Sequence, residues 1–99
     1  MESISRHQLR AARMLLNISQ AQLAVRAVVG VATVRRFELG QNIRHAQMQS
    51  IVRALQAAGV IIFEAGTFIG GVEVEIGVAL ARSAAATDET GRKERQPLD

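Results

Sequence analysis

Two capping boxes stand fourteen residues apart near the start of the chain, the first formed by Ser5 and Gln8 and the second by Ser19 and Gln22. In such a box a serine and a glutamine side chain satisfy each other's backbone N–H groups, so each pair marks the first turn of a helix. Asn17 lies between the boxes, and asparagine tolerates the left-handed conformation that ends a helix. The opening of the chain is therefore limited to short helices joined by tight turns.

Apolar residues at helical spacing continue this pattern as far as Gly59. The repeating positions are Leu9, Ala12 and Leu16, then Leu23 and Ala24 after Ile18, then Val34 and Phe37, and finally Met48, Ile51, Val52 and Leu55. They predict a second helix that ends near Ala27, a third over about residues 31–39 and a fourth that ends at Gly59. Because only residues 28–30 join the second helix to the third, the two must cross steeply, which leaves the third exposed.

After Gly59 the apolar residues change from helical to alternating spacing. Residues 60–63 read as a buried strand, and apolar residues alternate with glutamate or glycine over residues 72–78. We expect these two segments to pair as a hairpin. The loop of that hairpin would hold Gly66, Gly70 and Gly71. The alternative is a helix, since one helical face would hold Val72, Ile76 and Leu80.

The chain thus divides into a helical domain over residues 1–59, a β extension over residues 60–82 and a tail over residues 83–99. The tail is rich first in alanine and then in charged residues, which predicts disorder.

Charge is unevenly divided along the chain. Residues 1–59 hold eight arginines and two glutamates, a net charge of +6, whereas residues 60–99 hold four basic and seven acidic residues, a net charge of −3. All but one of the cations are arginine, whose forked guanidinium suits phosphate and guanine better than the ammonium of lysine does. The helical part is therefore the candidate for binding a polyanion.

Several function classes are disfavoured by what the sequence lacks. It has no cysteine, which excludes disulfides, thiolate metal sites and a cysteine nucleophile. His7 and His45 stand in separate basic segments without an acidic partner nearby, and no apolar run approaches the roughly 20 residues of a membrane span. We expect no catalytic residues, no metal site, no cofactor and no membrane contact.

One family pattern covers nearly half of the chain, residues 9–55. The residues that carry it are Arg13, Ser19-Gln20-Ala21-Gln22-Leu23-Ala24, Ala32-Thr33-Val34-Arg35-Arg36-Phe37-Glu38 and Gly40, followed by Ala54-Leu55-Gln56-Ala57-Ala58-Gly59-Val60. In their order and spacing they resemble the phage-repressor type of helix-turn-helix protein, which includes Cro, the lambda-type repressors and the xenobiotic-response-element regulators of bacteria. The resemblance implies a mainly α, lambda repressor-like domain of four to five helices with a short C-terminal β extension. It also implies a transcriptional repressor of the bacterial cytoplasm and nucleoid that binds a palindromic double-stranded DNA operator as a homodimer.

The resemblance assigns roles to individual residues. It places against DNA Gln20, Gly30, Val31, Ala32, Thr33, Arg35, Arg36 and Arg44. Gln20 would meet a phosphate at the start of the second helix, or lie on the surface without that role. Arg36 would read guanine O6 and N7, or else touch phosphate, whereas Arg35 and Arg44 would contact the DNA backbone or solvent. Arg13 and Glu38 would form a buried ion pair with a structural role.

Three positions depart from the family pattern. Val28 stands where the family prefers glycine, and a β-branched residue resists positive φ, so we expect a reshaped turn. Gly30 replaces the usual serine or threonine cap, which is tolerable but loses a side-chain phosphate contact. Residues 31–32 are apolar, whereas this family often has polar side chains there that hydrogen-bond to base edges. Recognition of bases would therefore depend on apolar contacts with thymine methyl groups and on Thr33 and Arg36.

The alternating segment also offers a contact between chains. An exposed strand edge over residues 72–78 invites a strand of another chain, and the simplest partner is an identical copy. We therefore expect a homodimer through residues 60–80. The alternative is a protein-interaction module, antitoxin-like or adaptor, whose main partner is another polypeptide and in which DNA binding is secondary.

Overall fold

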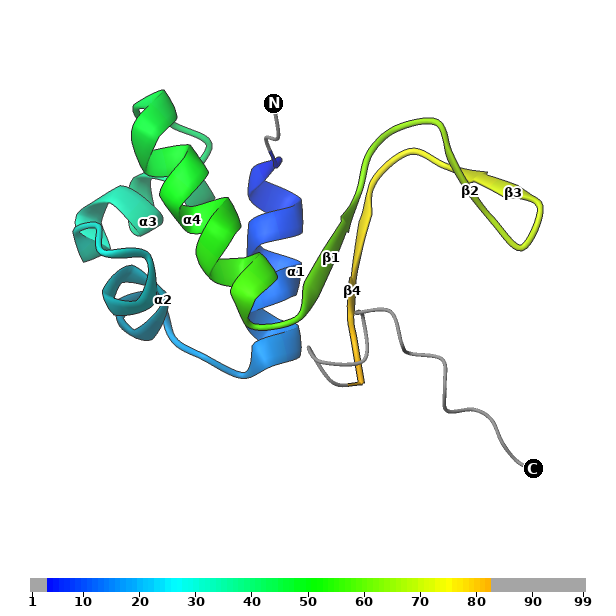
Figure 1. Ribbon diagram of the computed structural model, residues 1–99. Coiled ribbons are helices and arrows are strands. Elements are labelled where there is room, and N and C mark those ends of the chain that lie inside the picture. The colour runs from blue at the N-terminus through cyan, green and yellow to red at the C-terminus, as the bar shows by residue number, and fades with distance from the viewer. Residues whose placement is uncertain (1–3, 83–99) are drawn as a thin grey trace.

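The computed structural model describes residues 4–82, which form four helices followed by four strands (Figure 1). The helices are α1 (Arg6–Leu16), α2 (Gln20–Ala27), α3 (Val31–Glu38) and α4 (His45–Ala57), and the strands are β1 (Val60–Phe63), β2 (Thr67–Ile69), β3 (Val72–Val74) and β4 (Gly77–Leu80). The helices pack together, and the strands extend from them as a long ribbon on the side away from α3. The mainly α fold with a C-terminal β extension is confirmed. The tail predicted over residues 83–99 lies outside the described residues.

Both predicted capping boxes are present. The backbone N–H of Gln8 donates to Ser5 Oγ over 3.1 Å, and the Ser5 N–H donates to Gln8 Oε1 over 3.0 Å. The Gln22 N–H donates to Ser19 Oγ over 3.0 Å, and the Ser19 N–H donates to Gln22 Oε1 over 2.8 Å. Asn17 ends α1 with a φ of 57°, the left-handed conformation that its position predicted. Local side-chain chemistry therefore sets where the first two helices start.

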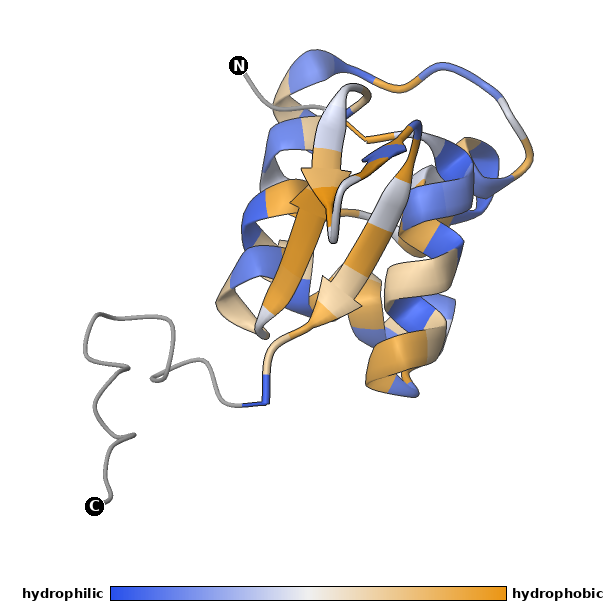
Figure 2. Cartoon of the chain, turned by 90° about the vertical axis from the view of Figure 1, so that its right-hand side faces the viewer, coloured by the Kyte–Doolittle hydropathy of each residue, from blue (hydrophilic) through white to orange (hydrophobic). Residues whose placement is uncertain are grey.

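The core lies between the four helices and is completed by the ribbon. The largest fully buried side chains are Leu9, Leu23, Val34, Ile51 and Leu55. Val60 of β1 is also buried, and Ile62 and Val78 pack against the same cluster. In Figure 2 the ribbon lies in front of the helices, with β1 against α4 and β4 against α1. The inner face of β1 and β4 is thus part of the core of the helical domain.

The β extension is a hairpin rather than the alternative helix, but the predicted loop is wrong in its extent. The paired residues are Val60↔Leu80, Ile61↔Ala79, Ile62↔Val78 and Phe63↔Gly77 in one sheet, and Thr67↔Val74, Phe68↔Glu73 and Ile69↔Val72 in the other. Only Gly70 and Gly71 remain as the loop, with φ values of 58° and 81°. A type I′ turn of two residues requires positive φ at both positions, which glycine adopts without steric cost.

A β-bulge divides the ribbon where residues 64–66 of one strand oppose only residues 75–76 of the other. The continuous strand predicted over residues 72–78 is therefore wrong. Val78 packs on the core, whereas Val74 reaches the opposite face of the ribbon beside Gly77. The bulge changes which residues of the second strand face the helices, and regular alternation in the sequence did not reveal this change.

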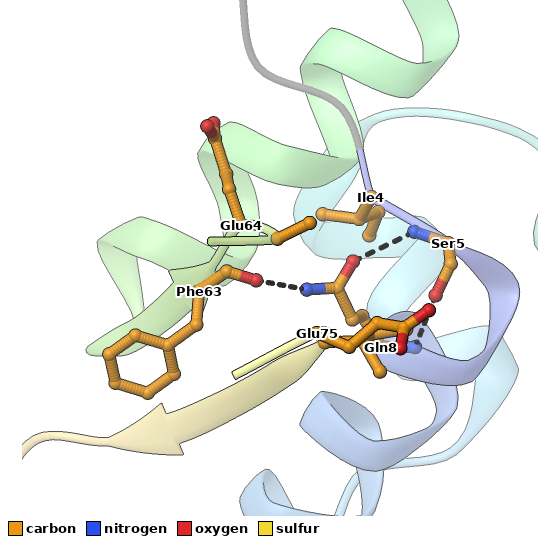
Figure 3. Close-up of a pocket in the computed structure, with 8 residues that line it drawn as sticks. Ile4, Ser5, Gln8, Phe63, Glu64 and Glu75 are labelled. Atoms are coloured by element: carbon orange, nitrogen blue, oxygen red, sulfur yellow. Dashed lines mark hydrogen bonds between the residues drawn. The ribbon is translucent and has the colours of Figure 1, made fainter. Parts of the chain in front are cut away.

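Gln8 ties the ribbon to α1. Its Nε2 donates to the carbonyl oxygens of Phe63 and Gly77, over 2.9 and 3.0 Å, while its Oε1 accepts from Ser5 (Figure 3). Gln8 is buried, and both hydrogens and the oxygen of its amide are engaged. Phe63 and Gly77 form the last pair of β1 and β4, which places Gln8 where the ribbon leaves the helices. The sequence identified Gln8 only as a capping residue.

The turn between α2 and α3 keeps a left-handed residue despite its valine. Val28 has a φ of 57° and a ψ of 47°, and the Val29 N–H closes the turn by donating to the Ala24 carbonyl over 3.0 Å. The predicted reshaping of this turn is wrong. The Val28 side chain is 88% exposed, so no packing offsets the steric cost of this conformation at a β-branched residue.

Replacing that valine should therefore stabilise the protein. Val28→Gly is expected to raise the free energy of unfolding by about 1 kcal/mol, because glycine adopts the left-handed conformation without a clash. For a domain of this size the melting temperature rises by roughly 4–8 °C, which thermal denaturation followed by circular dichroism measures. Val25→Gly is the control: this valine is also exposed but lies inside α2, where glycine should lower stability by about 0.5 kcal/mol. A lower melting temperature for Val28→Gly would contradict the assignment of strain.

Candidate nucleic-acid interface

One face of α3 is open to solvent. The side chains that it presents are Val31, Ala32, Arg35 and Arg36, while Thr33, Val34 and Glu38 are buried on the other face. The buried face packs along α2, and the ribbon lies at the other end of the molecule (Figure 1). A large partner can therefore approach the exposed face of α3 without meeting the ribbon.

Gly30 opens α3 without adding a side chain. It has a φ of −73° and a ψ of 149°, the extended geometry of a cap residue, and no side-chain hydrogen bond covers the helix start. The space that a β-carbon at Gly30 would occupy is empty. The start of a helix carries partial positive charge on its unpaired N–H groups. The tip of α3 is thus a bare, slightly positive surface flanked by Val31 and Ala32.

Arg36 and Arg44 line one shallow hollow of about 520 Å³, although they come from different elements. Arg36 lies on α3, and Arg44 is the residue that caps α4. The hollow is completed by Asn42, Ile43 and Gln47. Both arginines are exposed, and two guanidinium groups beside one hollow suit a phosphate or a base edge with several acceptor atoms. The structure brings together two residues to which the sequence assigned separate roles.

Thr33 faces inward, away from this surface. Its side chain is 5% exposed, and its Oγ1 accepts a hydrogen bond of 3.4 Å from Gln47 Nε2. The Oε1 of Gln47 accepts from the backbone N–H of Arg44 over 3.2 Å, so Gln47 links the start of α4 to α3. A base-reading role for Thr33 does not fit this burial. Sequence reasoning missed Gln47, whose spacing from Arg44 is that of a capping box, because the serine or threonine of such a box is absent.

Behind the exposed face, Glu38 joins three helices. Arg13 of α1 donates to it from Nε over 2.7 Å and from a terminal guanidinium nitrogen over 2.9 Å, so that both carboxylate oxygens are engaged. Gln20 of α2 donates from Nε2 to Glu38 over 3.0 Å, and Arg10 Nε lies 4.0 Å away. The Glu38 and Arg13 side chains are 6% and 16% exposed. The amide that was predicted to meet a phosphate is thus held by Glu38, with one of its two hydrogens still available.

The pKa of Glu38 reflects opposing effects. Burial disfavours the charged carboxylate and raises the pKa. Hydrogen bonds from Arg13 and Gln20, together with the charges of Arg13 and Arg10, outweigh burial and hold the pKa of Glu38 below its ordinary value. The hydrogen bond to Glu38 in turn raises the pKa of Arg13, against the effect of burial. Both partners are therefore charged at neutral pH.

The chain matches the helix-turn-helix family model HTH_3, of the Cro/C1 type, over residues 9–60. This match covers more than half of the chain and runs from α1 to the first residue of β1, so the chain belongs to this family. No curated protein matches it significantly.

Family membership and the exposed face of α3 identify a DNA-binding regulator of transcription. The members of this family are DNA-binding regulators and are not typically enzymes. Within residues 4–82, every helix is too short or too polar to cross a membrane.

Loss of the buried carboxylate should destabilise the whole helical domain. Glu38→Ala leaves Arg13 partly buried without its partner, and breaking such a pair costs about 3 kcal/mol of unfolding free energy. Chemical denaturation measures this loss. Glu64→Ala removes an exposed carboxylate from the ribbon and serves as the control, with an expected change within about 0.5 kcal/mol. A change of a degree or less in the melting temperature of Glu38→Ala would show that the pair contributes nothing.

The lowered pKa of Glu38 also predicts a pH dependence. The folded carboxyl binds its proton less tightly than the unfolded one, so its contribution to stability is full above the unfolded pKa of about 4.3. That contribution disappears as the pH falls through the lower, folded pKa. The difference in unfolding free energy between wild type and Glu38→Gln should therefore be constant from neutral pH to about 5 and shrink below about 4. A difference that stays constant down to pH 2, or one that grows on acidification, would contradict this assignment.

Proposed function

We propose that this protein is a sequence-specific repressor that binds a palindromic operator in double-stranded DNA as a homodimer through residues 60–80. The observation that carries the proposal is the exposed face of α3 beside the hollow shared by Arg36 and Arg44. The major groove is about 12 Å wide and admits a single helix, which the exposed α3 can supply. The proposal includes a location in the bacterial cytoplasm, associated with the nucleoid, where such operator DNA is found.

The side chains on and around α3 fall into two groups, those that contact bases and those that contact the phosphate backbone. Arg36 reads guanine, because its guanidinium can donate to both O6 and N7. Residues 31–32 contact thymine methyl groups through their apolar side chains, which extend no hydrogen-bonding group toward other bases. Gln20 and Arg44 bind phosphates and fix the position of α3, and Arg35 supplies a further backbone contact.

Two copies on one operator increase the number of these contacts. A single α3 with four exposed side chains reads only a few base pairs, whereas a two-fold dimer reads two half-sites about 34 Å apart. Repression follows if such a dimer occupies promoter DNA. A protein-interaction module is the second candidate, and the exposed apolar side chains of the ribbon are the observation that favours it.

Variants of three exposed arginines test the assignment. The target is first obtained by selecting bound fragments from a genomic library with the purified protein. Arg36→Ala should weaken the best sequence by about 1–3 kcal/mol and reduce the preference among sequences. Arg44→Ala should weaken all sequences alike and reduce the slope of log affinity against log salt by about one. Fluorescence anisotropy over a range of salt concentrations measures both effects.

Arg53→Ala is the matched control. It removes the same charge from an exposed position of α4, about 13 Å along the helix from Arg44 and outside the hollow. Its binding should be nearly that of wild type. Equal losses from all three variants would mean that net charge alone drives binding, and no measurable binding of wild type to any duplex at low salt would end the proposal.

A further inference from the structure

The start of α3 presents no polar side chain to solvent. Residues 27–32, which run from the end of α2 through the turn into α3, are Ala27-Val28-Val29-Gly30-Val31-Ala32. Thr33 is the first polar residue after them, but it is buried and its hydroxyl accepts a hydrogen bond from Gln47. Val31 is 37% exposed, and Ala32 is exposed as well. A partner that meets the start of α3 therefore meets apolar side chains.

The same residues are small, which lets the helix backbone come close to a partner. Gly30 has no side chain, and a β-carbon built on it would meet nothing within 4 Å. Ala32 has a single methyl group as its side chain. α3 also lies on the side of the helical domain away from the ribbon (Figure 1). Apolar contacts form only when heavy atoms approach within about 4 Å, and this part of α3 permits that approach.

The chemistry of the major groove limits what apolar side chains can recognise there. The base edges present hydrogen-bond donors and acceptors, and thymine adds an apolar group, the methyl on C5. A valine or alanine placed against a donor or acceptor would deprive it of water without replacing the lost hydrogen bond. Placed against a methyl group, the same side chain gains free energy because both apolar surfaces leave water. The start of α3 thus suits methyl groups and no other feature of the base edges.

We infer that α3 recognises the methyl group itself, whichever pyrimidine carries it, so that 5-methylcytosine is accepted in place of thymine. The two bases carry the methyl group on the same ring carbon and differ at C4, where thymine has an oxygen and cytosine an amino group. A side chain that donates or accepts a hydrogen bond would be needed to distinguish them, and residues 27–32 hold none. This inference rests on the proposed function and extends its target class to DNA methylated at cytosine.

Arg36 predicts where the methyl group lies in the target. Ala32 and Arg36 are four residues apart, so they share one stripe of α3 and are separated by about 6 Å along its axis. Successive base pairs are about 3.4 Å apart. A methyl group in contact with Ala32 should therefore lie about two base pairs from the guanine that Arg36 contacts.

Four versions of the selected duplex test the inference at that position. The base pair there is made T·A, U·A, C·G or 5-methylcytosine·G. Uracil is thymine without the methyl group, so T over U and 5-methylcytosine over C are two affinity ratios that each report the methyl group alone. Burial of one methyl group is worth about 0.8 kcal/mol, so each ratio should be about fourfold. Fluorescence anisotropy measures both ratios, and contacts with the C4 substituent cancel within each.

Variants of α3 separate direct contact from an effect of the methyl group on DNA shape. Val31→Ala and Ala32→Gly each remove apolar atoms from the start of α3, and at least one of them should bring both ratios close to one. Val25→Ala and Ala21→Gly make the same changes at exposed positions of α2 and should keep the fourfold ratios. Circular dichroism spectra and melting temperatures verify that all four variants fold.

Each alternative result has its own reading. Equal binding with and without the methyl group would overturn the inference and leave the proposed function intact. A fourfold ratio for T over U with none for 5-methylcytosine over C would show that thymine is recognised by more than its methyl group, which also overturns it. Fourfold ratios that persist in both α3 variants would assign the effect to DNA shape. No binding to any duplex would end the proposed function together with this inference.

Discussion

A buried carboxylate holds the first three helices in fixed positions relative to one another. Glu38 lies at the last turn of α3 and accepts hydrogen bonds from Arg13 of α1 and Gln20 of α2. A charge in such a place is stable only when its partners are fixed at hydrogen-bonding distance, so the three helices cannot shift independently without exposing or unpairing it. The exposed face of α3 owes its position to this cluster. Gln20 contributes to this support through the hydrogen bond from its amide to Glu38.

The ribbon is attached to the helical domain by a different interaction, the hydrogen bonds of a neutral amide. Gln8 satisfies two carbonyl groups at the end of the β1 and β4 pair, where an unpaired backbone oxygen beside the core would be costly. The same side chain closes the capping box of α1. The start of the first helix and the exit of the ribbon are therefore fixed by one residue. Beyond that point β2 and β3 extend away from the helices (Figure 1).

Strain at Val28 shows which interactions dominate the turn. A β-branched residue disfavours the left-handed conformation by about 1–2 kcal/mol, yet the turn keeps it. The packing of α2 against α3 and the bonds at Glu38 require this geometry, and their combined stabilisation exceeds the local cost. Local preference at Val28 predicted a reshaped turn, and tertiary contacts overrode it.

The sequence by itself determined the elements whose signals are local. Capping side chains lie within three residues of the backbone groups they satisfy, and Asn17 ends α1 by its own conformational preference, so short-range pattern was enough to place the helices. Only the tertiary structure decided what depends on distant residues. These are the burial of Thr33, the place of Arg36 and Arg44 beside one hollow, and the hydrogen bonds from Gln8 to the ribbon. It also decided which face of the ribbon is outermost, because a one-residue bulge reverses the alternation that the sequence displays.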